Sequence, residues 1–236
     1  MKPIYDLGMP GSKYILRTCI VVIAFTTIAL SQVANPSPLN PKERNGKWGY
    51  VNEAGVFVIT PKYFAAQPFV DGLALVVTKK TWTPLGSEYG EFRLTQVTWI
   101  DSSGRKIHKP ISVRSAHSFS DGRAAVVPDF VMRLHGGCAK GGYIDANGSW
   151  AIQPNFDAVS DFSEGLAAVN VGAQCGMGGK WGYINKAGAL AIPPRFLFAG
   201  HFQNGRACVM EEAHKNVVID KTGTVVAERC ADARVD

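Results

Sequence analysis

The chain has 236 residues, of which 46% are hydrophobic and 19% charged, so it is long enough to bury a core and wholesale disorder is excluded. Its 25 glycines and 13 prolines indicate many turns and few long helices. The formal net charge is +6, and removal of residues 1–34 would leave 6 − 2 = +4, too small an excess to predict nucleic-acid binding.

The N-terminal segment, residues 1–34, has the layout of a secretory signal peptide. Basic residues precede an apolar run at 19–30, and small residues around Ser31 follow it. The run is shorter than the roughly 17–25 residues that a membrane span needs. We therefore expect export to the periplasm or the medium, with a retained inner-membrane anchor as the alternative. Residues 35–45, rich in proline and polar residues, are expected to be a linker and a poor strand.

A short motif then recurs: an aromatic residue, an aliphatic residue, Asn or Asp, two further residues and Gly. The best copies lie in KWGYVNEAG and KWGYINKAG, at Tyr50 and Tyr183, and weaker copies begin at Trp99, Tyr143 and Val218. A second motif, Phe followed by an acidic residue or Asn and then Gly, comes after each of the first four copies. From the first glycine to the second is 17 or 18 residues, as from Gly55 to Gly72. Such regular spacing indicates a tandem repeat.

Each unit has the pattern of three strands. In the first unit these are residues 48–52, 56–59 and 73–78, with alternating or continuous apolar residues and turn residues between them. The sequence predicts an all-β domain at residues 46–230, with a short tail at 231–236. About four and a half three-stranded units would stack as an open array, and a closed propeller-like ring is the alternative.

The phrases G-K-W-G-Y-[VI]-[ND]-x-x-G, I-x-P-x-F and F-x-[DEN]-G-[LR]-A resemble the WG-repeat family of bacterial proteins. The resemblance covers about residues 46–226, although the copies at Val97-Thr98-Trp99 and Gly141-Gly142-Tyr143 depart from the pattern. It implies a repetitive β architecture and a binding or scaffolding role with an unspecified target. It implies no catalytic mechanism and therefore transfers no site residues.

Residues that recur at one phase are expected to build the unit. The series Asp71, Asp121, Glu164 and Asn204 precedes the second glycine, so we interpret these residues as turn formers rather than paired catalytic carboxylates. The recurring aromatics are expected in the core between units; they are Trp48, Tyr50, Tyr143, Trp181 and Tyr183. Lysines precede most anchors, at Lys47, Lys140, Lys180 and Lys215, either as a basic stripe or as solvated residues at strand starts.

Residues that do not repeat are better candidates for binding. The stretch 79–96 interrupts the first unit and carries aromatic residues beside basic ones: Lys79, Lys80, Trp82, Tyr89, Phe92 and Arg93. Such a combination suits an anionic glycan or a protein surface. The alternative is a hairpin with a small hydrophobic face of its own.

Four cysteines follow the leader, an even number that favours disulfides in an exported chain. Cys138 and Cys175 lie in glycine-rich loops ahead of successive anchors, so stacked units would favour a bridge between them. Cys208 would then pair with Cys230, although other pairings and free thiols stay open.

The remaining chemistry-bearing residues form no recognised catalytic set. No serine occupies a nucleophile elbow, and a metal set at His135, Cys138 and Cys175 lacks a fourth ligand. We expect no enzyme activity, no cofactor and no metal. The hypothesis is a binding or scaffold module of the bacterial envelope whose partner is an envelope protein or a wall or surface polymer. A hydrolase assembled across units and a purely structural spacer are the alternatives.

Overall fold

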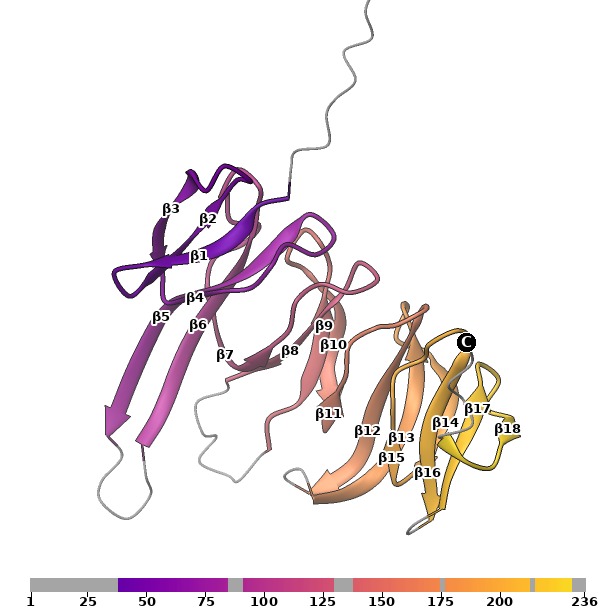
Figure 1. Cartoon of the computed structure of the whole chain (residues 1–236). Helices are drawn as coiled ribbons and strands as arrows, with labels where there is room; N and C mark the ends of the chain where they lie inside the picture. Colours follow the sequence, from indigo (N-terminus) through magenta and orange to yellow (C-terminus); the bar gives the residue numbers. More distant parts are fainter. Residues whose placement is uncertain (1–37, 85–90, 130–137, 175–176, 213–214, 231–236) are drawn as a thin grey trace, which may run out of the picture. The chain divides into compact units, whose positions relative to one another are not determined.

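The computed structural model describes residues 38–84, 91–129, 138–174, 177–212 and 215–230, and these contain eighteen β-strands and no α-helix (Figure 1). The predicted all-β class is therefore confirmed. Within these residues no helix has the length and hydrophobicity required to cross a membrane. The predicted signal peptide or anchor, residues 1–34, and the tail at 231–236 lie outside the described residues.

The strands form four sheets, and every strand pair in them is antiparallel. The first sheet contains β1 (Asn40–Arg44), β2 (Lys47–Val51) and β3 (Phe57–Tyr63). The second contains β4 (Ala65–Ala66), β5 (Leu73–Pro84), β6 (Glu91–Asp101), β7 (Ile111–Ala116), β8 (Ala124–Pro128), β9 (Gly141–Ile144) and β10 (Trp150–Phe156). The third contains β11 (Ala158–Val159), β12 (Leu166–Gln174), β13 (Met177–Asn185) and β14 (Leu190–Phe196). The fourth contains β15 (Phe198–Ala199), β16 (Arg206–Glu212), β17 (Lys215–Asp220) and β18 (Val225–Ala227). None of these sheets closes on itself, so the array is open, as predicted.

The sheets do not coincide with the units read from the sequence. The third strand of each unit pairs with the anchor strand of the next unit, as β5 does with β6 and β12 with β13. These two strands follow one another in the chain, so antiparallel pairing closes only a short loop and costs little entropy. Three strands per unit was correct, but the third and fourth sheets each draw their strands from two units, and the second sheet draws its strands from three.

Strand β1 corrects the expectation that residues 35–45 make a poor strand. It pairs with β2 from Asn40 opposite Val51 to Arg44 opposite Lys47. Asn45 and Gly46 between the two strands have φ of 54° and 72°, as in a two-residue type I′ hairpin turn. Pro41 is tolerated because β1 is an edge strand. β1 thus takes the place that the third strand of a preceding unit has in the other sheets.

The core lies between successive units. Leu73, Ala74, Leu75 and Val76 on β5 are all buried, which requires that both faces of the strand are covered. Ala74 and Val76 pack in one cluster with Tyr50 of the first sheet, whereas Leu73 and Leu75 belong to the next cluster. Alternate residues of β5 thus belong to the core clusters on its two faces, which shows that successive units stack face to face.

The anchor tyrosines Tyr50, Tyr143 and Tyr183 are buried, which confirms their predicted core role. Trp48 and Trp181, predicted in the same place, are only partly buried and pack against the core clusters. The hydroxyl of Tyr183 is 2.8 Å from the carbonyl oxygen of Gly200, to which it donates, and the ring lies 4.9 Å from that of Phe202. The same donation recurs in the other three units, from Tyr50 to Gln67 at 2.8 Å, from Trp99 Nε1 to His117 at 3.1 Å and from Tyr143 to Ser160 at 2.7 Å. Burial raises the pKa of all three tyrosines, so each keeps its proton as a donor.

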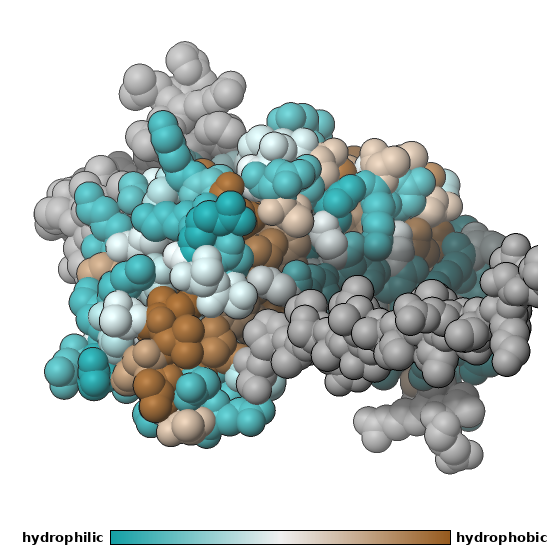
Figure 2. Space-filling view, turned by 90° about the horizontal axis from the view of Figure 1, so that it is seen from above, coloured by the Kyte–Doolittle hydropathy of each residue, from teal (hydrophilic) through white to brown (hydrophobic). Residues whose placement is uncertain are grey.

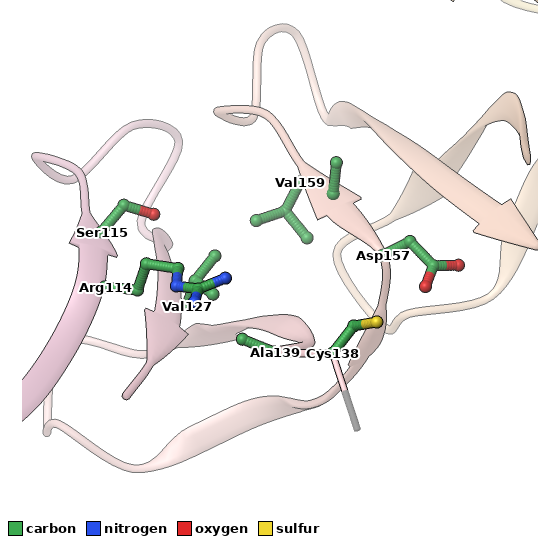
Figure 3. Close-up of a pocket in the computed structure, with 8 residues that line it drawn as sticks. Arg114, Ser115, Val127, Cys138, Ala139, Asp157 and Val159 are labelled. Carbon is green, nitrogen blue, oxygen red and sulfur yellow. The ribbon is translucent and has the colours of Figure 1, made fainter. Parts of the chain in front are cut away.

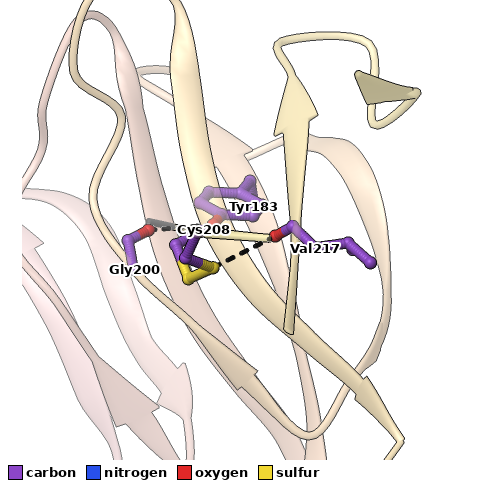
Figure 4. Close-up of a disulfide and its surroundings, with 5 residues drawn as sticks. Tyr183, Gly200, Cys208 and Val217 are labelled. Atoms are coloured by element: carbon purple, nitrogen blue, oxygen red, sulfur yellow. Dashed lines mark hydrogen bonds between the residues drawn. A yellow bond between two sulfur atoms is a disulfide. The ribbon is translucent and has the colours of Figure 1, made fainter. Parts of the chain in front are cut away.

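The fourth sheet carries the predicted disulfide between Cys208 and Cys230, with a Cα–Cα distance of 5.5 Å (Figure 4). Cys208 lies opposite Val218 in the register of β16 and β17. Val217 and Ile219 belong to the core cluster, so Val218 faces the outer side, yet only 1% of it is exposed. The disulfide therefore holds the chain end near the outer side of the last sheet. Cys138 is also disulfide-bonded, and its predicted partner Cys175 lies outside the described residues.

Candidate functional site

The recurring acidic turns are two-residue hairpin turns. Asp71, Asp121, Glu164 and Asn204 have φ between 51° and 54°, and the glycines that follow them have φ between 74° and 86°. Positive φ at both central residues defines the type I′ turn, which Asp, Asn and Gly tolerate best. The predicted turn role is confirmed.

The carboxylates of these turns also link one unit to the next. An oxygen of Asp71 accepts a hydrogen bond from the Gly122 amide at 3.1 Å, and Asp121 accepts one from the Gly165 amide at 2.6 Å. Glu164 continues the series, accepting from the Gly205 amide at 2.9 Å. We call this row of contacts the turn ladder. It was not predicted, and it gives the repeated acids a structural partner in the following unit.

The predicted binding stretch forms the outer part of a long hairpin. β5 pairs with β6 from Leu73 opposite Asp101 to Pro84 opposite Glu91. Neighbouring strands cover only the base of this hairpin. β4 pairs with β5 no further along than Val77, and β7 pairs with β6 no further along than Thr95. Beyond these points the described strands form a two-stranded ribbon with an open edge on each side, which projects past its neighbours in Figure 1.

The six candidate residues are distributed along this ribbon. Lys79 and Lys80 are exposed on β5. The register places Trp82 opposite Arg93 and Phe92 opposite Thr83. Tyr89 and the side chains of residues 81–94 lie outside what the structure describes. The hairpin is thus confirmed, and its ligand-binding role stays a prediction.

The lysines ahead of the anchors mostly have partners. Lys47 Nζ lies 3.3 Å from the centroid of the Phe64 ring. Lys140 forms an ion pair with Asp157, and Lys215 forms one with Glu211 at 3.0 Å. A continuous stripe of free cations along the array is therefore not formed.

A cavity of about 250 Å³ lies near the junction of the second and third sheets (Figure 3). The residues that line it include Arg114 and Ser115 of β7, Val127 of β8, Cys138, Asp157 and Val159 of β11. The sequence analysis did not identify this site.

Asp157 in the cavity wall is fully engaged. Its Oδ1 is bound by Lys140 Nζ, and its Oδ2 accepts hydrogen bonds from the amides of Gly172 at 2.8 Å and Ala173 at 3.1 Å. Its side chain is only 4% exposed. Burial acts to raise the pKa of Asp157, but the Lys140 bond and the two amides outweigh it and the pKa is lowered. The carboxylate is therefore charged and already bound to donors on both oxygens.

Arg114 lies within β7 of the second sheet, between the residues of β7 that pair with β6 and those that pair with β8. We call this position the crossover, because in the other units the residue there joins strands of two different sheets. Phe64, Asp157 and Leu197 occupy the crossover in the other units. Arg114 is exposed and has no ion pair among the residues that the structure describes. A comparison of crossover residues in the repeat would have identified it, because a cation there breaks the series.

A pair of side chains, His117 and Asp161, joins the second and third units. His117 Nδ1 lies 2.7 Å from Asp161 Oδ1, and the bond to Asp161 raises the pKa of His117 although partial burial opposes it. The described part of the chain contains no group of three or more His, Cys, Asp or Glu residues arranged to hold a metal.

Among the described residues, exposed hydrophobic side chains occur on several sheets. Val56 and Val58 lie at the first sheet, Leu190 in the third and Phe198 in the fourth. Figure 2 shows a hydrophobic patch on an otherwise largely hydrophilic face. Exposed apolar residues are common on protein surfaces, and the hairpin and the cavity are the better candidate sites because they depart from the repeat.

Comparison with known proteins gives a family match. A family model described as WG containing repeat matches residues 48–82, 142–175 and 181–212. No curated protein and no solved structure matches the chain.

Proposed function

Because the chain belongs to the WG-repeat family, we propose that it is an exported, non-catalytic binding or scaffold module of the bacterial envelope. Its target is an envelope protein or an anionic surface polymer. The disulfide between Cys208 and Cys230 supports export, because such bonds persist in oxidising compartments and are rare in the cytosol.

The observation that carries the proposal is the ribbon of β5 and β6. Repeated residues build the array, whereas this ribbon extends past the strands on either side of it. Open strand edges present unpaired amide and carbonyl groups to which an extended segment of another protein can add as a strand. Lys79 and Lys80 at its base give it a positive charge, which favours an acidic partner.

The experiment is a pull-down from envelope extract with the full-length chain as bait, alongside sedimentation with isolated wall and surface polymer. The test variant is Lys79→Glu/Lys80→Glu. The matched control is Lys106→Glu/Lys186→Glu, which makes the same charge change at two exposed lysines away from the ribbon. We expect binding to fall about tenfold or more in the test variant, because reversal of rim charges typically costs about 1 kcal/mol each.

The molecule recovered distinguishes a protein target from a polymer target. A specific protein in the pull-down identifies a protein partner, and co-sedimentation identifies a polymer; either result must be weakened by the test variant and not by the control. Equal loss in both variants, or no recovery of protein or polymer by the unmodified chain, contradicts the proposal.

A further inference from the structure

The cavity beside Arg114 contains a cation with no anion to balance it. Lysines at the matching position of other units reach the crossover residue one strand away: Lys47 lies over Phe64 and Lys140 binds Asp157. In the second unit that position is Gln96, and the crossover residue is Arg114. Neither a lysine nor a carboxylate therefore meets the guanidinium from within its own unit.

The one carboxylate of the cavity wall does not fill this role. Both oxygens of Asp157 are bound by Lys140 and by the amides of Gly172 and Ala173. Figure 3 shows the Asp157 carboxylate turned away from the guanidinium of Arg114, which points into the space between the strands. The guanidinium of Arg114 is thus available to a ligand, whereas the carboxylate of Asp157 is already bound by other residues of the protein.

The remaining wall suits a small aliphatic group. Val127, Ala139 and Val159 contribute methyl groups, and the exposed Ser115 adds a hydroxyl to the lining. The volume of about 250 Å³ lies just below the range of roughly 300–1,000 Å³ for drug-sized ligands. A guanidinium binds a carboxylate through two parallel hydrogen bonds.

We propose that this cavity binds a carboxylate carried on a small aliphatic body, of the size of an alanine residue. The carboxylate pairs with Arg114 and the methyl group packs on Val127 and Val159. The ligand is a free small acid or the C-terminal residue of a peptide, since both present the same chemistry. This site goes beyond the proposed function, because it shares no residue with the ribbon of β5 and β6.

The test is a calorimetric or NMR titration of the full-length chain. The probes are N-acetyl-L-alanine, its neutral amide, the tripeptide Gly-Gly-Ala with a free C-terminus, and inorganic phosphate. We expect N-acetyl-L-alanine to bind with a Kd on the order of 1 mM, and the amide and phosphate to bind at least about tenfold more weakly.

The variants assign the binding to Arg114. Arg114→Gln should weaken N-acetyl-L-alanine about 10- to 100-fold, because it removes a charged hydrogen-bond donor. Arg206→Gln is the matched control, an exposed arginine on β16 that does not line the cavity. Arg114 is exposed, so circular dichroism and melting should show both variants folded.

The outcomes separate the sources and decide the proposal. Tripeptide binding equal to that of N-acetyl-L-alanine supports a peptide end, and binding of N-acetyl-L-alanine alone supports a free acid. Equal binding of the amide, equal binding of phosphate, or unchanged binding by Arg114→Gln overturns the proposal. Each readout is independent of the partner assay with the Lys79→Glu/Lys80→Glu variant, so the two proposals can fail separately.

Discussion

Two buried tyrosine hydroxyls, one bonded and one not, allow the hydrogen bonds of the repeat to be tested directly. The Tyr183 hydroxyl is 2.8 Å from the Gly200 carbonyl oxygen to which it donates, and the residue is 1% exposed. The Tyr63 hydroxyl is equally removed from water but has no hydrogen-bond partner among the described residues. Phenylalanine removes the same single oxygen atom from either position.

The expected signs are opposite. Tyr183→Phe loses the hydrogen bond and leaves the Gly200 carbonyl unpaired, which costs about 1–2 kcal/mol. Tyr63→Phe removes a buried polar group that gains nothing in the folded state, so the free energy of unfolding stays level or rises by about 1 kcal/mol. For a chain of this size about 1 kcal/mol corresponds to roughly 2–4 °C in Tm.

The assay is urea denaturation monitored by tryptophan fluorescence, with the midpoint compared at constant slope. Both variants keep the ring, so the contact of Tyr183 with Phe202 at 4.9 Å is preserved. Equal midpoints for the two variants, or a lower midpoint for Tyr63→Phe than for Tyr183→Phe, would refute the argument that the repeated hydroxyl stabilises the stack.

Three further outcomes follow from contacts in the array. Asp121→Val should lower the free energy of unfolding by about 2 kcal/mol or more, because a β-branched residue is strained at φ 54° and the bond to the Gly165 amide is lost. Asp121→Asn keeps the turn and should cost less. Urea denaturation midpoints of the two variants measure the difference. The raised pKa of His117 predicts that its pair with Asp161 stabilises fully below the ordinary histidine pKa, and that this stabilisation is lost as pH rises through the raised pKa. Asp161→Asn should abolish that part of the pH dependence, which lies above the ordinary histidine pKa of about 6.5. Replacement of Cys208 and Cys230 by serine should lower stability by about 3 kcal/mol for a loop of 22 residues, and a loss below about 0.5 kcal/mol would contradict a stabilising role in the last sheet.

Much of the fold follows from local sequence signals. The turn series and the anchor aromatics were predicted because Asp-Gly turns and alternating apolar residues act within a few positions of the chain. The pairing of Cys208 with Cys230 was predicted from their places in the last unit. Each of these signals depends on near neighbours in the sequence.

Other features of the fold depend on how strands far apart in the sequence pair, which local patterns do not predict. Pairing across units, as in β12 with β13, depends on the connection between strands rather than on any one strand pattern. The turn ladder joins residues 41 to 51 positions apart, such as Asp71 and Gly122, so no local pattern reports it. β1 was missed although Asn45-Gly46 is a strong hairpin signal, because Pro41 and the polar residues around it were given more weight.

The candidate sites divide in the same way. The stretch 79–96 was identified because it interrupts the repeat, and the structure places it in a hairpin. The cavity was missed because its walls come from β7, β8 and β11 and from the residues just ahead of β9 and β11, which meet only after the units stack. The one signal within reach was the crossover series, in which Arg114 stands out from Phe64, Asp157 and Leu197.

The offset between units and sheets has a consequence for how such a chain can lengthen. The third strand of each unit pairs with the anchor strand of the next, so every unit shares a sheet with the unit that follows it. A duplicated unit inserted anywhere in the middle therefore finds a matching surface on both sides, and no existing contact has to change in kind. Only the first and the last sheet lack a neighbouring unit on one side. Here β1 supplies the edge strand of the first sheet, and the Cys208–Cys230 disulfide fastens the last. Growth by gene duplication is thus compatible with the fold at every internal boundary.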